Sequence, residues 1–230
     1  MSIRESELKF TSESFCEMAI KSGLDKVCQS DLNFKENIIC SIYFDTPDWC
    51  FAMEKASSDF LKTKVRLRWY RESSDGTNDS SPCFLEFKRK IGSKREKERI
   101  EMPFNSTDVF SQIQQQENID LFEALIKKHA PEMANRQVQP RFVVQYKRNR
   151  YFEPQSKTRI SLDRQIQAYG VSNSTVFIQH AINLPELVLE VKGNCEDLPL
   201  ALRSIYPGKL KKAAFSKYYE SFKLLTGYDQ

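Results

Sequence analysis

The chain has 230 residues, of which 40% are hydrophobic, and this is enough to bury the core of one β-rich domain. Its 35 basic and 31 acidic side chains leave a net charge of only +4, so total charge does not indicate a nucleic-acid partner. Six cysteines lack metal-ligand or redox spacing, and the sequence has neither a signal-peptide pattern nor a run of about 18 apolar residues. We therefore expect a cytoplasmic protein with reduced thiols and without a membrane segment.

Patterns of apolar residues predict the elements of the first half. Ile3–Phe10 alternates and predicts a strand. The following segment, Thr11–Ser22, predicts a helix that ends at Gly23 and places Phe15, Met18 and Ala19 at helical spacing. Further strands are expected over Ile38–Phe44, Lys62–Tyr70, Cys83–Lys90 and Glu96–Met102, with a turn at Asp45–Asp48 and a long polar loop at Ser73–Pro82.

The second half predicts a helical region and three more strands. Val109–Ala130 has helical spacing with an interruption near Asn118. The strands are expected over Arg141–Phe152, Lys157–Gln167 and Leu187–Lys192, and helices over Asp197–Tyr206 and Ser216–Thr226. Because no linker divides the chain and no repeat is found, we expect a single domain over residues 1–230.

The segment Val65–Tyr70, VRLRWY, alternates arginine with apolar residues. Because successive side chains of a strand point to opposite faces, Arg66 and Arg68 share one face and Leu67 and Trp69 lie on the other. Two fixed guanidinium groups are suited to binding phosphate.

Other predicted strands repeat this division between a charged face and an apolar face. The charged positions include Glu5, Glu7, Lys9, Glu86, Lys88, Lys90, Lys97, Arg99, Arg148, Arg150, Arg159, Asp163, Glu190 and Lys192. One interpretation is an antiparallel sheet whose charged face lies in water. The other, which we favour, covers the apolar faces with helices and turns the charged faces inward, in a closed eight-stranded barrel with a charged lumen and peripheral helices. Cations crowded in such a lumen require an anion such as a phosphate chain.

Carboxylates are the only metal ligands that the pattern offers. Glu5, Glu7 and Glu190 supply hard oxygen ligands, which suit Mg²⁺ or Mn²⁺, although each could instead form an ion pair with a neighbouring lysine. The two histidines, His129 and His180, give no basis for a histidine triad, and no glycine-rich nucleotide-binding motif is present.

The ordered motifs resemble one known family. ESELK at Glu5–Lys9 is similar to the ExExK signature of triphosphate tunnel metalloenzymes of the CYTH-like superfamily. SIYFDTPD, VRLRWY, FLEFKRK, KERI, YKRNRYF, RISLDR, LVLEVKG and FSKYY then follow in the order found in the VTC domain. This is the catalytic domain of vacuolar transporter chaperone polyphosphate polymerases, and the resemblance spans nearly the whole chain.

The resemblance implies a set of site residues. Arg66, Arg68, Lys88, Arg148 and Lys217 would be catalytic; Lys9, Lys97, Arg159, Lys192 and Ser216 would bind phosphate or nucleotide; Glu190 would hold the metal, with Glu7 and Glu5 as further candidates. The chain departs from the pattern where Lys55 replaces an arginine and where Ala214 replaces a basic residue, with Lys211 and Lys212 nearby as substitutes. Lys55 and Lys212 are therefore included as candidate nucleotide-binding residues.

The implied function is polyphosphate synthesis, in which ATP with Mn²⁺ or Mg²⁺ supplies its γ-phosphoryl group to a growing polyphosphate chain. One alternative is a tunnel phosphohydrolase acting on tripolyphosphate, a nucleoside triphosphate or an RNA 5′-triphosphate. Another is a polyphosphate-binding module without catalysis. Apart from a 5′-triphosphate end, nucleic acid is not an expected partner, and the sequence leaves the oligomeric state open.

Overall fold

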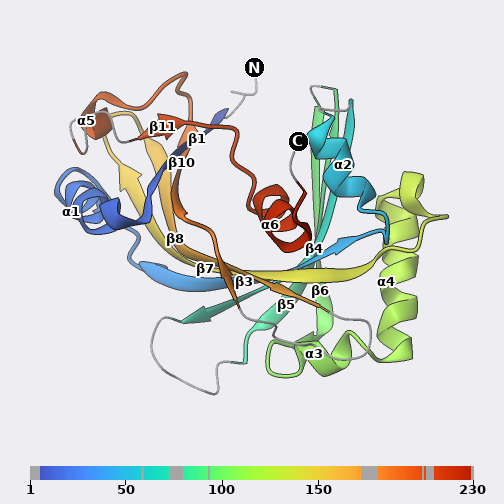
Figure 1. Ribbon diagram of the computed structural model, residues 1–230. Coiled ribbons are helices and arrows are strands. Elements are labelled where there is room, and N and C mark those ends of the chain that lie inside the picture. Colours follow the sequence, from blue (N-terminus) through green and yellow to red (C-terminus); the bar gives the residue numbers. More distant parts are fainter. Residues whose placement is uncertain are drawn as a thin grey trace. The chain divides into compact units, whose positions relative to one another are not determined.

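The structure, a computed structural model, describes residues 6–57, 60–72, 80–92, 94–171, 181–203, 205 and 210–228 (Figure 1). It is mainly antiparallel sheet with a few helices, which confirms the α+β class. The strands are β1 (Ser6–Glu13), β2 (Gln29–Ser30), β3 (Glu36–Asp45), β4 (Leu61–Glu72), β5 (Pro82–Ile91), β6 (Lys94–Asn105), β7 (Gln139–Glu153), β8 (Thr158–Gly170), β9 (Ile182–Asn183), β10 (Glu186–Gly193) and β11 (Lys211–Lys212). The helices are α1 (Glu17–Val27), α2 (Cys50–Ala56), α3 (Val109–Gln112), α4 (Gln116–His129), α5 (Leu200–Arg203) and α6 (Lys217–Thr226), with 3₁₀ segments at Ser14–Cys16 and Pro131–Met133.

The prediction of a closed eight-stranded barrel is wrong. The eleven strands form one hydrogen-bonded sheet in the order β11-β1-β10-β8-β7-β3-β4-β5-β6, with β2 paired to β7 and β9 to β8. Within the described residues, β11 and β6 end this order and are not paired with each other, so the sheet is not closed. Strands β2, β9 and β11 have two residues each, too few to produce the alternation from which strands were predicted.

The chain forms two compact units. Unit 1 contains residues 1–38, 146–167 and 183–217, and unit 2 contains residues 39–145, 168–182 and 218–230. The chain passes from one unit to the other within β3, β7, β8 and β9 and at the start of α6. This division does not test the prediction of a single domain.

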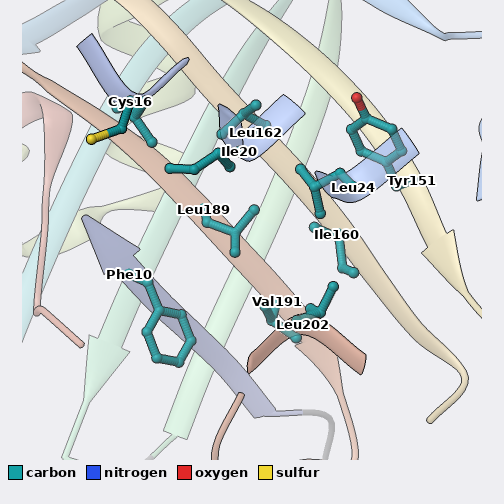
Figure 2. Packing of buried hydrophobic residues seen from close by; sticks show 11 residues of the cluster. Phe10, Cys16, Ile20, Leu24, Tyr151, Ile160, Leu162, Leu189, Val191 and Leu202 are labelled. Carbon is teal, nitrogen blue, oxygen red and sulfur yellow. The ribbon is translucent and has the colours of Figure 1, made fainter. Parts of the chain in front are cut away.

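In unit 1, α1 covers the apolar face of β1, β10 and β8. Figure 2 shows Phe10 of β1, Leu189 of β10 and Leu162 of β8 in one cluster with Ile20 and Leu24 of α1. All five side chains are nearly inaccessible to solvent. Burial of each such side chain stabilises the fold by about 1.5–3 kcal/mol. The opposite face of these strands is then left for polar groups.

The helix predicted over Thr11–Ser22 is wrong in its boundaries. Strand β1 continues through Glu13, and α1 begins only at Glu17 and runs past Gly23 to Val27. Of the three residues predicted at helical spacing, Phe15 and Met18 are 72% and 77% exposed, and Ala19 is also exposed. Gly23 serves close packing instead of helix termination, because a Cβ atom there would lie 2.2 Å from Cγ2 of Ile205.

In unit 2, β4, β5 and β6 form an antiparallel meander whose apolar face is covered by α4. Val65, Leu67 and Leu85 are fully buried on this face. Phe87 of β5 stacks on His129 at the end of α4, with ring centroids 5.3 Å apart. The prediction that helices cover the apolar strand faces therefore holds within each unit.

The turn predicted after β3 is confirmed, and Asp45 organises it. Its buried carboxylate accepts hydrogen bonds from the backbone amides of Thr46, Phe51 and Ala52 and from the hydroxyl of Tyr218. Trp49, in left-handed conformation with φ of 60°, precedes α2. Burial raises the pKa of Asp45 despite these hydrogen bonds. The carboxylate satisfies amides at the start of α2 that the helix itself cannot pair.

The remaining predicted elements agree in part with the structure. The helical region after β6 is divided into α3 and α4, and buried Asn118 donates from its side chain to the carbonyl of Gln112 across the break. The helix expected at Ser216–Thr226 is α6, whereas the one expected at Asp197–Tyr206 is described only as α5, and Tyr206 lies outside the described residues. Residues 73–79 of the predicted loop also lie outside them.

All six cysteines are free, as expected. Among the helices that the structure describes, none has the length and apolar character needed to cross a membrane.

Replacement of Gly23 by alanine tests the packing of α1. In a helix interior, replacement of glycine by alanine normally raises the free energy of unfolding by about 1 kcal/mol. Here the contact between the new Cβ atom and Ile205 should instead lower the free energy of unfolding by about 1–3 kcal/mol. Urea unfolding of Gly23→Ala measures this, with Ser22→Ala, an exposed position of the same helix, as the control. A stability gain in Gly23→Ala would contradict the close approach.

Candidate functional site

The charged face of unit 1 is aligned by strand register. Lys9 of β1 lies opposite Glu190 of β10, which lies opposite Ser161 of β8. The next row aligns Glu7, Lys192 and Arg159. Directly paired residues of antiparallel strands share a face, so these six side chains lie on the face opposite the cluster under α1.

Buried charges of unit 1 form one connected network. Arg148 donates two hydrogen bonds to Asp163, at 2.5 and 2.6 Å, and a third to Glu190 at 3.1 Å. Lys217, at the start of α6, has its Nζ 2.5 Å from Oδ2 of Asp163 and 3.7 Å from Oε1 of Glu190. Lys9 approaches the same Glu190 oxygen to 3.6 Å. Three cations therefore converge on two carboxylates.

This network keeps all four buried members ionised. Burial alone would raise the pKa of both carboxyl groups, but Arg148 and Lys217 outweigh it and lower the pKa of Asp163 and, together with Lys9, that of Glu190. Burial would lower the pKa of the two cations, and Asp163 and Glu190 instead raise it for both Arg148 and Lys217. These four side chains therefore carry fixed charges near neutral pH.

Two further contacts hold the cations in place. Lys9 donates a hydrogen bond to the backbone carbonyl of Phe215 at 3.2 Å, and the Nζ of Lys217 lies 4.7 Å from the centre of the Tyr146 ring. Ser216, which lies between Phe215 and Lys217 in the sequence, is buried. The carbonyl of Phe215 and the side chain of Lys217, at the start of α6, therefore lie beside the charged side chains of β1 and β10.

In unit 2, four cations surround one carboxylate, Glu86 of β5. Arg66 donates to its Oε2 from Nε at 2.8 Å and from Nη2 at 2.5 Å, and Arg68 lies 4.0 Å from the same oxygen. Lys97 and Arg99 of β6 approach Oε1 to 3.6 and 3.8 Å. Within this group of five, four positive charges face one negative charge.

Polar and aromatic groups orient the two arginines. Nη1 of Arg66 donates to the hydroxyl of Tyr43 at 3.3 Å, and Nε of Arg68 donates to Ser41 at 3.0 Å. Both arginines are buried, with 9% and 7% of their surface exposed. Strand β3 therefore supplies the partners that hold the pair predicted from VRLRWY.

Burial alone would raise the pKa of Glu86, but its cations reverse the effect. Arg66 and Arg68, with a smaller contribution from Lys97, lower the pKa of this carboxyl group from its usual 4.5 to about 2. Glu86 is thus ionised throughout the neutral range.

Several residues of these networks had no role in the sequence prediction. Asp163 and Glu86 were placed on charged faces but given no function, and Ser41, Tyr43 and Arg99 were not identified as site residues. The alternating pattern locates such residues on a face, but strand register decides which carboxylate meets which cation.

The structure does not bring every predicted residue to these networks. Lys88 lies in register between Lys64 and Lys97 on the charged face of unit 2, and Arg159 and Lys192 share the row of Glu7. Within the described part of the chain, no ion pair joins Lys55, in the last turn of α2, to Glu86, although both residues lie in unit 2. Glu5 lies outside the described residues.

Lys212 is also absent from the networks. It is exposed, pairs with Phe10 on the apolar side of β1, and donates to the backbone carbonyl of Glu196. Its neighbour Lys211 pairs with Thr11, which shares the charged face with Lys9. Of the two proposed substitutes, register places Lys211 on the charged face.

The described acidic residues do not form a metal site by themselves. Among the residues with described positions, no three His, Cys, Asp or Glu side chains are grouped so that they could hold an ion. Glu190 has Arg148, Lys9 and Lys217 within 3.7 Å, and Glu7 lies 3.7 Å from Lys9. These residues alone do not form a chelating site, so a bound cation would need additional oxygen ligands from a substrate.

Comparison with known protein families identifies the family to which this chain belongs. The model of the VTC domain matches residues 6–226, a range that includes both charged faces. The chain belongs to the VTC domain family. A search of curated proteins found no match.

The solved structures that match this VTC domain share little sequence with it. They include a putative adenylate cyclase from Bacillus halodurans, with 11% identity, a TM-score of 0.43 and coverage of 84% of this chain and 83% of the other. A putative adenylate cyclase from Vibrio parahaemolyticus has 13% identity, a TM-score of 0.39 and coverage of 97% and 86%. A conserved hypothetical protein from Pyrococcus furiosus has 12% identity, a TM-score of 0.41 and coverage of 90% and 95%.

The lowered pKa of Glu86 predicts a specific pH dependence of stability. Because the folded-state pKa lies below the usual value, the ionised carboxylate stabilises the fold above about pH 4.5, and this contribution disappears as the pH falls toward 2. Urea unfolding at several pH values should therefore show Glu86→Gln clearly less stable than wild type at pH 7, with the difference shrinking toward pH 2. Glu101→Gln, at an exposed position of the same face, is the control. A difference independent of pH would exclude ionisation of Glu86 as its cause.

Proposed function

We propose that this VTC domain is a polyphosphate polymerase that transfers the γ-phosphoryl group of ATP to a growing phosphate chain. The observation that carries the proposal is the charge of the β4–β5–β6 face, where register aligns nine cations with two carboxylates. The cations are Lys62, Lys64, Arg66, Arg68, Lys88, Lys90, Arg95, Lys97 and Arg99, and the carboxylates are Glu86 and Glu101. A face of this composition suits a ligand with several negative charges along its length.

The chemistry needs little beyond these cations. Phosphoryl transfer proceeds through a loose transition state in which charge spreads over the phosphate oxygens, so positioning and charge neutralisation provide most of the catalysis. Arg66 and Arg68 are buried and already oriented by Tyr43 and Ser41, and they can hold phosphate oxygens with little reorganisation.

The charged face of unit 1 supports phosphate binding in the same way. Arg148 and Lys217 are held by Asp163 and Glu190, and Lys9 by Glu190 and the carbonyl of Phe215. Lys192 and Arg159 continue this face in register with Glu7. These are side chains that the family resemblance assigns to phosphate.

Mg²⁺ or Mn²⁺ would enter as the counterion of the nucleotide. Glu190 is the protein carboxylate proposed to contact it, with phosphate oxygens completing the ligand set, since the described residues alone form no chelating group. The bound ion would supply additional neutralisation of phosphate charge.

The decisive experiment incubates the purified protein with ATP and Mn²⁺ and measures both polyphosphate, by gel electrophoresis, and free phosphate. We expect long chains together with ADP. Release of orthophosphate without chains would establish the phosphohydrolase alternative. Tight polyphosphate binding without either product would identify a binding module.

Replacement of Arg68 by alanine tests the assigned cation. We expect turnover to fall by about 100- to 1,000-fold, as for the loss of one preorganised donor, and Arg68→Lys to recover part of it. Thermal unfolding measured in parallel checks that each variant is folded. Arg71→Ala, at an exposed position on the other side of the same strand, should retain activity. Full activity in folded Arg68→Ala would remove this residue from the reaction.

A further inference from the structure

Two aromatic side chains lie on the charged face of the β4–β5–β6 meander. Tyr70 follows Arg68 by two positions on β4 and therefore shares its face. Phe84 of β5 is paired directly with Arg68 and lies on the same face. Both rings are only partly buried, whereas Leu67 and Leu85 on the other face are fully buried. The two rings are therefore not part of the core beneath α4, and they adjoin an arginine proposed to hold phosphate.

The side chain of Arg99, on the neighbouring strand β6, is held against both rings. Its Cζ atom lies 3.7 Å from the centre of the Phe84 ring, which is a van der Waals contact over the ring. Its Nη2 donates a hydrogen bond to the hydroxyl of Tyr70 at 3.5 Å, and its Nε lies 3.8 Å from Oε1 of Glu86. Three neighbours on β4 and β5 therefore orient one guanidinium group.

Arg99 differs from the other two arginines of this face in its accessibility. Its side chain is 39% exposed, whereas Arg66 and Arg68 are buried. Strand β6 also ends the strand order, and within the described residues no further strand pairs with it beyond Arg99. A ligand can therefore reach the guanidinium group that Phe84 supports from one side.

A planar cation supported in this way is suited to stacking. Arginine stacks on aromatic rings, and proteins use guanidinium planes as well as aromatic side chains to stack nucleobases. An inorganic phosphate chain has no planar group to place there. A ligand that uses both Arg99 and the adjacent pair Arg66 and Arg68 combines a flat aromatic group with phosphates, and this is the chemistry of a nucleotide.

We propose that Arg99, supported by Phe84 and Tyr70, stacks on the base of the nucleotide whose phosphates bind at Arg66 and Arg68. This base subsite rests on the proposed function and deepens it, because it specifies how the domain recognises the nucleoside part of its substrate. Stacking gives a nucleoside triphosphate a contact that tripolyphosphate cannot make. The two ligands should therefore respond differently to changes at Arg99.

Exchange of Arg99 for lysine tests the base subsite, because it keeps the positive charge and removes the plane. The full chain, as wild type and as Arg99→Lys, is titrated with the non-hydrolysable β,γ-imido analogue of ATP and with tripolyphosphate. We expect binding of the analogue to weaken at least about fivefold, as for the loss of one stacked base, and binding of tripolyphosphate to change less than about twofold. Phe84→Leu, which alters no charge, should weaken binding of the analogue in the same selective way.

A second pair of an arginine and an exposed aromatic ring provides the matched control. In unit 1, Cζ of Arg150 lies 5.7 Å from the centre of the Phe34 ring, and Phe34 is 56% exposed. Phe34→Leu makes the same change of side chain as Phe84→Leu at a position outside the β4–β5–β6 meander. It should leave binding of both ligands within about twofold of wild type. Thermal unfolding of every variant checks that it is folded.

Three results would overturn the proposal. They are unchanged binding of the analogue in folded Arg99→Lys, an equal loss for tripolyphosphate in that variant, or an equal loss in Phe34→Leu. A single-stranded DNA oligonucleotide without a triphosphate that binds as tightly as the analogue, and is weakened equally by Arg99→Lys, would assign the stack to nucleic acid instead. A selective loss in Arg99→Lys in a protein that makes no polyphosphate would contradict the proposed polymerase and leave the base subsite intact.

Discussion

The alternation of side chains along antiparallel strands is the constraint on which the rest of this structure depends. Each strand must bury its apolar side chains against a helix, as Leu189 does under α1 and Leu67 does in unit 2. The intervening positions then lie on the other face, where packing no longer selects apolar residues. Charged side chains such as Lys9 and Arg66 can gather there without disturbing the core.

On both charged faces, a few carboxylates hold a larger number of cations. Asp163 fixes Arg148 through two hydrogen bonds, and Glu86 fixes Arg66 in the same manner. Removing a carboxylate would leave a buried cation without its partner, which is costly, but the excess of positive charge remains available to a ligand. Such carboxylates orient the cations, and under the proposed function the excess positive charge binds the phosphates of the substrate.

Much of this arrangement could be predicted from the sequence because it follows from the period of two. The shared face of Arg66 and Arg68 and the long strands β7 and β8 are examples. Strand register could not be predicted, since it depends on contacts between strands that are distant in the sequence. The sequence therefore did not indicate the role of Glu86, nor that Lys211 and not Lys212 lies on the charged face. The prediction of a closed barrel was also wrong, because the pattern within a strand contains no information about which edge strands pair with each other.

The residues on the two faces of β5 are under different physical constraints. Leu85 and Phe87 are constrained by the packing beneath α4, whereas Lys88 and Lys90 lie on the opposite face, outside that packing. Substitutions at Lys88 and Lys90 can therefore change the charge of this face while the core residues stay the same. During divergence, a lineage could acquire a new anionic substrate one row at a time, without passing through an unfolded intermediate sequence.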